Sequence, residues 1–289
     1  MTKWKWWHWG KGPVDFQIRE LLRAVWDLHS MYGADEPWLW RGQANYRFSI
    51  MPAVHSRVRV RSRLDDDIVK SITKTLILSA RRASLDMHEG TTLPELALLA
   101  LLQHHGAATP LLDVSLDPVV GLYMSVVSPS TKDDDEDGAL FAIRKPTTTI
   151  APFDSRRFAT VYDSLPRDRV IFYSAPDISE RLRIQRGHFL IGKVSKDDVR
   201  VTIPLTVDDA KTLKGTWLWH RLDRRGKKGA PPSATTDVGV FRIPAQFKDR
   251  IRSWLEEGTG LTREFVYPTS WHQLHLDRFA ASHGRKAPL

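Results

Sequence analysis

Polar side chains interrupt an apolar stretch between Leu102 and Ser115, where the sequence is richest in groups that do chemistry. Gln103-His104-His105-Gly106 ends a leucine-rich helix predicted over 93–104, and Thr109 and Asp113 follow shortly after. Buried polar groups of this kind cost free energy unless they bond to one another or to a ligand. A histidine at a helix C-terminus is favoured in its charged form. Asp113 either orients such a histidine or pairs with an arginine.

A second candidate is the aromatic strand predicted over 38–43, in which Arg41 is followed by Gly42. A guanidinium in an apolar strand needs a carboxylate partner or an anionic ligand. The neighbouring glycine permits close backbone approach to that ligand. An internal pair between the arginine and a carboxylate explains the pattern equally well, so both interpretations stay open.

Several chemistries lack their motifs. The chain has no cysteine and no H-E-x-x-H pattern, and adjacent His104 and His105 point in different directions on a helix, so no metal site is expected. The P-loop, the dinucleotide-binding glycine pattern and G-x-S-x-G are also absent. A hydrolase that uses His104 and Asp113 as an acid–base pair is a hypothesis resting on residue types alone.

Charge and composition favour a soluble protein with a polyanionic partner. The 289 residues carry a formal charge of +9 with a sequence pI of about 9.8, and 42% are apolar. No apolar run approaches the roughly 18 residues of a membrane span, and the N-terminus lacks the pattern of a signal peptide, so a cytoplasmic protein without membrane contact is expected.

A basic, aromatic N-terminal arm and a row of alternating arginines are the candidate nucleic-acid contacts. The residues concerned are Trp4, Lys5 and Trp6, and Arg57, Arg59 and Arg61. Packing of the N-terminal segment over a domain edge is the alternative interpretation.

Periodicity predicts an α+β protein with a helical first half followed by a mostly antiparallel sheet. The predicted helices are 14–31, 65–87, 93–104, one starting at Asp117-Pro118, and 245–257. The predicted strands are 38–43, 139–144, 170–173, 188–194, 199–203 and 239–243. An acidic loop over 128–138 is expected to be mobile, and 226–236 to be an exposed loop. The predicted organisation is an arm (1–13), one domain (14–270) and a tail (271–289).

These segments resemble the FRG domain family, whose aromatic-Arg-Gly signature is similar to Trp40-Arg41-Gly42-Gln43. The family's second motif is similar to Q-H-[HY]-G-x-x-T-R-L-L-D-W-[ST], then N-P and an apolar helix. The corresponding segments in this sequence are Gln103-His104-His105-Gly106, Asp113-Val114-Ser115 and Asp117-Pro118. Arg183 to Phe189 resembles the family's R-x-x-x-Q-x-G-x-F strand entry, and the resemblance covers roughly residues 14–270. Pro110, Val114 and Asp117 depart from the family's usual arginine, tryptophan and asparagine, and loss of the arginine removes an anion contact.

The aromatic-Arg-Gly strand also resembles the first motif of ADP-ribosyltransferases. That resemblance implies a split sheet in which Arg41 holds the phosphates of NAD and the backbone of Gly42 contacts nicotinamide, with Gln43 as a further cofactor-binding residue. It implies that Thr109 and Ser115 line the ribose pocket.

The third position of that motif set carries Gln185 where those enzymes have glutamate. Glutamine hydrogen-bonds ribose but supplies no negative charge, so His104, Asp113 or Glu180 would have to compensate.

The leading hypothesis is therefore an NAD-using transferase that modifies nucleic acid or protein, as a toxin or phage-defence effector would. Arg41, His104, Asp113 and Gln185 are its candidate catalytic residues. The alternative is a non-catalytic sensor that binds nucleic acid or a nucleotide through the same pocket and basic face.

Overall fold

The central element is a sheet of eight strands. The computed structural model describes residues 4–30, 38–57, 64–129, 131–194, 237–268 and 271–284. The strands of this sheet are β1 (Trp4–Trp7), β2 (Trp38–Gln43), β5 (Leu111–Ser115), β6 (Gly138–Arg144), β7 (Thr149–Ile150), β8 (Ile171–Tyr173), β9 (Gly187–Ile191) and β10 (Val238–Ile243). Their spatial order is β1-β10-β6-β2-β5-β9-β8-β7, and all neighbours are antiparallel except the two edge pairs, β1 with β10 and β7 with β8. A separate hairpin joins β3 (Met87–His88) to β4 (Thr91–Thr92).

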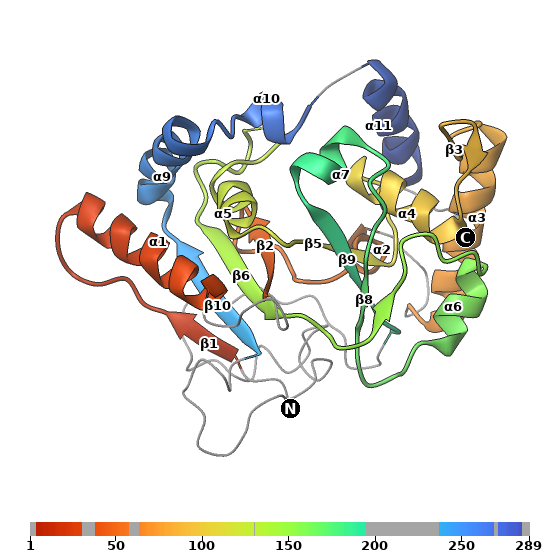
Figure 1. Cartoon of the computed structure of the whole chain (residues 1–289), viewed down its shortest axis with the longest axis horizontal. Coiled ribbons are helices and arrows are strands. Elements are labelled where there is room, and N and C mark those ends of the chain that lie inside the picture. Colours follow the sequence, from red (N-terminus) through yellow and green to blue (C-terminus); the bar gives the residue numbers. More distant parts are fainter. Residues whose placement is uncertain are drawn as a thin grey trace.

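Helices cover the sheet (Figure 1). Within the described residues they are α1 (Val14–Ser30), α2 (Ala53–Arg57), α3 (Asp66–Arg82), α4 (Glu95–His104), α5 (Pro118–Val126), α6 (Phe158–Ser164), α7 (Glu180–Ile184), α9 (Ala245–Thr259), α10 (Arg263–Val266) and α11 (Trp271–Gly284). The five predicted helices are present, although the one predicted over 65–87 ends at Arg82 and Met87 begins β3. The Asp117-Pro118 start forms as expected, because the Asp117 carboxylate accepts the Val119 N–H at 2.8 Å.

Five of the six predicted strands are also confirmed, while 199–203 and the predicted loop 226–236 lie outside the described residues. The expectation of a helical first half was too simple. Three strands of the sheet, β1, β2 and β5, come from the first 115 residues.

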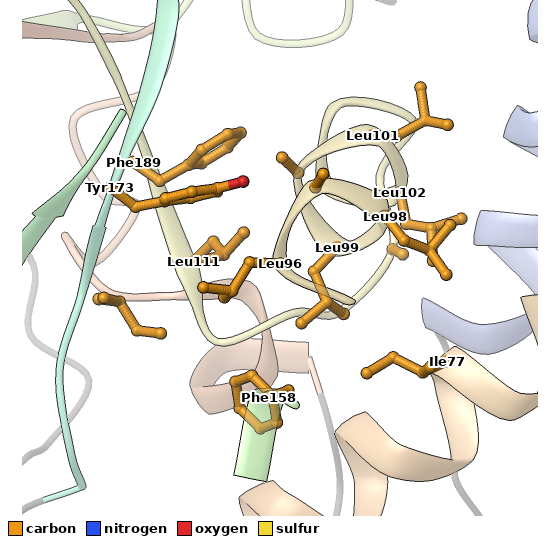
Figure 2. Close-up of a cluster of buried hydrophobic side chains, with 14 of the residues drawn as sticks. Ile77, Leu96, Leu98, Leu99, Leu101, Leu102, Leu111, Phe158, Tyr173 and Phe189 are labelled. Carbon is orange, nitrogen blue, oxygen red and sulfur yellow. The ribbon is translucent and has the colours of Figure 1, made fainter. Parts of the chain in front are cut away.

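Two separate groups of helices cover the same side of the sheet. Trp38 and Trp40 of β2 pack with buried residues of α1, α5 and α9. Phe189 of β9 and Tyr173 of β8 pack instead with the leucines of α4, which is buried on nearly every side (Figure 2). The boundary between these two groups of helices falls between β2 and β5.

Two glycines, Gly42 of β2 and Gly121 of α5, allow α5 to approach the sheet closely. A Cβ atom on Gly42 would stand 2.1 Å from the Gly121 carbonyl oxygen of α5. A Cβ on Gly121 would in turn stand 2.9 Å from the Cβ of Trp40. The close approach predicted for Gly42 is therefore to a helix of this chain. Gly42 also contributes to the lining of the cavity described below.

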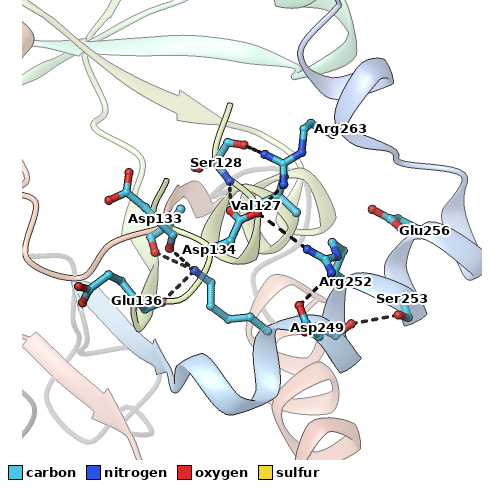
Figure 3. Close-up of polar contacts among 12 residues, drawn as sticks. Val127, Ser128, Asp133, Asp134, Glu136, Asp249, Arg252, Ser253, Glu256 and Arg263 are labelled. Atoms are coloured by element: carbon cyan, nitrogen blue, oxygen red, sulfur yellow. Dashed lines mark hydrogen bonds and ion pairs between the residues drawn. The ribbon is translucent and has the colours of Figure 1, made fainter. Parts of the chain in front are cut away.

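The acidic loop after α5 is anchored rather than free. Lys248 of α9 is buried, and its Nζ donates to the main-chain oxygens of Ala44, Asp133 and Glu136 at 2.8–2.9 Å. Figure 3 shows Arg263 approaching Ser128 and Asp134 in the same loop. These cations hold the described part of the acidic loop against the end of β2, and the expected mobility of the loop stays a prediction.

Both ends of the described chain are integrated into the fold. The predicted arm supplies β1, which pairs with β10, and this fits the alternative in which the N-terminus packs over a domain edge. The predicted tail supplies α11, which packs against α4. No helix in the described ranges combines the length and apolar character required to cross a bilayer.

Lys248→Met should lower the free energy of unfolding by about 2–4 kcal/mol, because one buried and two partly buried carbonyl groups would lose their donor. Chemical denaturation of both proteins measures the difference. Lys70→Met is the matched control, since Lys70 pairs with Asp67 and Asp163 at the surface, where such pairs contribute about 0–1 kcal/mol. Equal losses for the two variants would show that the Lys248 contacts do not stabilise the loop.

Candidate functional site

The site lies where β2 and β5 separate. Within the described residues, Trp40 and Ser115 are the one register pair that joins these strands. Beyond that pair, Nη1 of Arg41 donates to the main-chain oxygen of Asp113 at 2.8 Å. The Arg41 side chain thus bridges the two strands where their backbones no longer pair. It satisfies the Asp113 carbonyl group, which would otherwise need a strand partner.

Arg41 is a half-buried cation with bonding capacity to spare. Its Nη1 lies 3.6 Å from the Asp113 carboxylate, and its Nε is buried without a hydrogen-bond partner in the described part of the chain. Burial lowers the pKa of Arg41 and Asp113 opposes that shift, but a guanidinium stays charged at physiological pH. Both interpretations of Arg41 therefore contain part of the answer: it has an internal carboxylate, and it retains a donor for an anionic ligand.

A chain of hydrogen bonds orients Asp113. Its Oδ2 accepts from Gln103 Nε2 at 2.9 Å, and Gln103 Oε1 accepts from the Thr109 hydroxyl at 2.6 Å. Thr109 is fully buried, and its Oγ also accepts the Leu111 N–H. The prediction that Thr109 lines a ribose pocket is wrong, because its hydroxyl is used to position Gln103. Asp113 is 36% exposed and remains accessible.

Ser115 and Gln185 connect β5 to the turn before β9. The Ser115 hydroxyl donates to the Gln185 main-chain oxygen at 2.7 Å and accepts the Asp117 N–H. Gln185 Nε2 donates to the Val266 carbonyl of α10 at 2.9 Å. Both residues border a small cavity of about 30 Å³ beside Arg41 and His104. Their polar groups are thus engaged in holding three elements together at the edge of the site.

His104 is neutral. Its ring is buried, packs edge-on against Phe189, and has no hydrogen-bond partner at either nitrogen within the described chain. Burial lowers its pKa to about 3, although Asp113, 4.0 Å away, works in the opposite direction. The expected charged histidine at the helix end is therefore wrong, because desolvation outweighs the helix dipole. Gly187 provides the space, since a Cβ there would lie 2.8 Å from the imidazole.

His105 points elsewhere, as expected for its neighbour on a helix. Its Nδ1 lies 2.8 Å from Oδ1 of Asp277, which brings α11 to the rim of the site. Burial also lowers the pKa of His105, with Asp277 opposing the shift.

A cavity of about 480 Å³ opens beside these groups. Arg41, Gln43, His104, Asp113 and Arg181 contribute to its lining. Sequence reasoning missed Arg181 of α7, although the R-x-x-x-Q pattern places an arginine four residues before Gln185 and Arg181 is that residue. Its guanidinium lies 5.2 Å from the ring centre of Tyr267, and its Nε is buried and unpartnered among the described residues. Burial lowers the pKa of Arg181 as well.

Gln43 supplies the clearest unsatisfied group. The residue is 5% exposed, and neither atom of its amide has a hydrogen-bond partner in the described part of the chain. It lines this cavity and also an adjoining one of about 500 Å³. A buried amide with two open positions is costly unless a ligand satisfies them.

The residues predicted to contact nucleic acid separate into three groups. Trp6 is 5% exposed in the hydrophobic core, so its ring offers no face to a base, and that prediction is wrong. Trp4 and Lys5 lie with it on β1, at the far edge of the sheet from the site. Arg57 lines both large cavities, while Arg59 and Arg61 lie outside the described residues.

The comparison with protein families identifies an FRG domain at residues 36–134. This range contains β2, the end of α4, β5 and α5, so it includes Arg41, Gln43, Gln103 and Asp113. No curated protein and no solved structure gives a significant match to the chain.

The neutral state of His104 has a consequence for stability. Between its ordinary pKa of 6.5 and its folded pKa of about 3, the unfolded chain binds a proton at His104 that the folded chain does not. Stability is therefore lost as pH falls through this window, by up to about 1.4 kcal/mol per pH unit from this group.

His104→Leu should reduce that slope in denaturation curves recorded from pH 6 to pH 4. His8→Leu, at an exposed position, controls for the loss of a histidine in general. An unchanged slope in His104→Leu would mean that His104 is protonated in the folded protein.

Proposed function

We propose that this protein binds NAD as a substrate in the cavity lined by Arg41, within the FRG match, and Arg181, beyond it, and transfers ADP-ribose to a macromolecule. The observation that carries the proposal is the set of buried donors without partners: Arg41 Nε, Arg181 Nε and the Gln43 amide. All three residues line one cavity. NAD offers matching groups, since it has a diphosphate for the guanidinium groups and a carboxamide for an amide.

The gap between β2 and β5 supports a split-sheet arrangement similar to that of ADP-ribosyltransferases. In this arrangement, Arg41 and Arg181 hold the diphosphate. Gln43 pairs with the nicotinamide carboxamide, beside the backbone of Gly42. Gln185 lines this cavity, whereas Ser115 borders only the small cavity beside it. Both residues are held by bonds to neighbouring elements, and neither polar side chain needs to contact the substrate.

Asp113 is the residue that supplies the missing negative charge. During transfer, the bond between nicotinamide and the ribose carbon breaks, and its electron pair leaves with nicotinamide. Positive charge develops on the ribose until an acceptor atom forms the new bond and loses a proton. A fixed carboxylate nearby stabilises that charge. Gln103 holds Asp113 in place, and Arg41 bonds mainly to its backbone, so the carboxylate keeps a free face.

His104 contributes no proton in this scheme. A group with a pKa of about 3 is a poor general base or acid near neutral pH. This argues against the hydrolase hypothesis, in which His104 and Asp113 act as an acid–base pair. Modification of a cell's own macromolecules is an activity that would suit a toxin or a phage-defence effector.

A nucleotide sensor is the second candidate. It is favoured by the engagement of Thr109, Ser115 and Gln185 in internal hydrogen bonds, because three of the polar groups predicted to act on NAD are then used within the fold. A sensor would need the same donors for affinity but would release no nicotinamide.

Arg41→Ala and Arg181→Ala should each weaken NAD binding by about 10- to 100-fold, the effect expected when a charged hydrogen bond is lost. Isothermal titration of the purified protein measures the dissociation constant. Arg183→Ala is the matched control, because Arg183 lies on the same helix as Arg181 but pairs with Asp177 at the surface. Unchanged affinity in both cavity variants, or no NAD binding by the wild type, would contradict the proposal.

Asp113→Asn separates the enzyme from the sensor. It keeps the size of the side chain and the backbone contact with Arg41 but removes the charge. We expect nicotinamide release to fall by at least about 100-fold, the magnitude typical of losing one electrostatic group at a reaction centre, while NAD affinity changes little. Asp277→Asn is the control, since Asp277 borders the cavity but bonds to His105. NAD binding by the wild type without release of nicotinamide would favour the sensor.

A further inference from the structure

A second cavity adjoins the proposed NAD site. Its volume is about 500 Å³, and it shares Arg41, Gln43, Phe48, Arg57, Gln103 and Asp113 with the first cavity. The side chains that belong to the second cavity alone come from the segment between β2 and α2, from α2 itself and from the start of β5. They are Arg47, Ser49, Met51, Ala53, Ser56 and Leu111.

The lining combines an exposed aromatic ring with a buried apolar surface. Phe48 is 48% exposed, which leaves ring surface available. Met51, Ala53 and Leu111 are buried beside it. A flat aromatic ligand would cover both kinds of surface.

The rim of this cavity is positive. Among the described residues, Arg41, Arg47 and Arg57 line it, and Asp113 is the one carboxylate in that lining. Arg57 donates to the Gly106 carbonyl at 2.7 Å, and the exposed Arg47 lies 3.4 Å from Glu136. Both side chains are therefore positioned at the surface rather than extended into bulk solvent. An aromatic platform between cations is the arrangement that binds unpaired bases of a nucleic-acid strand.

We propose that this second cavity is the acceptor site and that it receives an unpaired nucleobase, with Phe48 stacking on the base and Arg47 and Arg57 contacting the adjacent phosphates. The binding role stands on the cavity alone, whereas the role as acceptor rests on the proposed transferase function. A basic protein side chain is disfavoured by the three arginines, and a carboxylate side chain would leave the apolar surface uncovered. A base within a duplex is stacked and paired, so a single strand is the substrate.

The shared boundary gives the transfer step its geometry. Asp113 lines both cavities, so the ribose carbon on one side and the base on the other can meet beside it. A nitrogen of the base forms the new bond to the ribose carbon and loses one proton to the Asp113 carboxylate. The bond to nicotinamide breaks, and nicotinamide departs with the electron pair.

Fluorescence anisotropy with short labelled RNA and DNA strands tests the binding role without any turnover. Phe48→Ala should weaken binding by about 5- to 150-fold, the effect of one lost base–aromatic stack, and Phe48→Tyr should restore it. Phe153→Ala is the matched control, since Phe153 is similarly exposed (59%) but lies between β7 and α6, outside both cavities. Arg47→Ala should weaken binding, whereas Arg250→Ala, which removes an arginine paired with Asp15, should not.

Ser56→Trp separates the two proposals. Ser56 lines the second cavity but not the first, so a bulky side chain there should block strand binding. NAD affinity should stay within about two-fold, and so should nicotinamide release measured without a strand, when water accepts the ADP-ribose. Thermal melting of each variant checks that the protein is folded.

Strand binding that is unaffected by both Phe48→Ala and Ser56→Trp would overturn the inference. So would transfer of ADP-ribose to a protein in a reaction without nucleic acid. If no variant or wild type binds NAD but Phe48→Ala and Ser56→Trp abolish strand binding, the base site stands and the transferase proposal fails. A preference for RNA or for DNA would identify the natural strand.

Discussion

The hydrogen bond from Arg41 to the main-chain oxygen of Asp113 is the contact around which the molecule is organised. It occurs where β2 and β5 stop pairing, and it allows two halves of a sheet to separate without leaving that carbonyl group unsatisfied. Because a guanidinium has five N–H donors, it can serve the backbone and still offer donors to a ligand. The cavity, its charge and the position of Asp113 all follow from this separation.

Packing on each side keeps the gap open and shaped. On one side, α5 lies against β2 because Gly42 and Gly121 have no side chains at their contact. On the other side, α4 inserts its leucines under β9, and Gly187 leaves room for the ring of His104. Lys248 fixes the acidic loop at the end of β2. The site is thus formed by rigid elements, with polar side chains held by hydrogen bonds between them.

The two proposals divide one polar groove between two ligands. Arg41, Gln43 and Asp113 lie at the boundary, where both large cavities include them. Arg181 and Tyr267 belong to one side only, and Arg47 and Met51 to the other. A carboxylate at the boundary is well placed for a group transfer. The leaving nicotinamide lies on one side of the ribose carbon, and the attacking atom approaches that carbon from the other side.

The sequence by itself determined the elements and the motif. Local signals were sufficient for the helix start at Asp117-Pro118, the leucine-rich helix before His104 and the strand around Arg41, because capping and periodicity act over a few residues. The same motif could not show which polar groups face a ligand. Thr109, Ser115 and Gln185 bond inside the fold, Trp6 enters the core, and His104 is neutral. Arg181, Phe48 and Arg47 join the site from segments far from the second motif. Only the tertiary structure decided these roles, since burial and hydrogen-bond partners depend on residues that are distant in sequence.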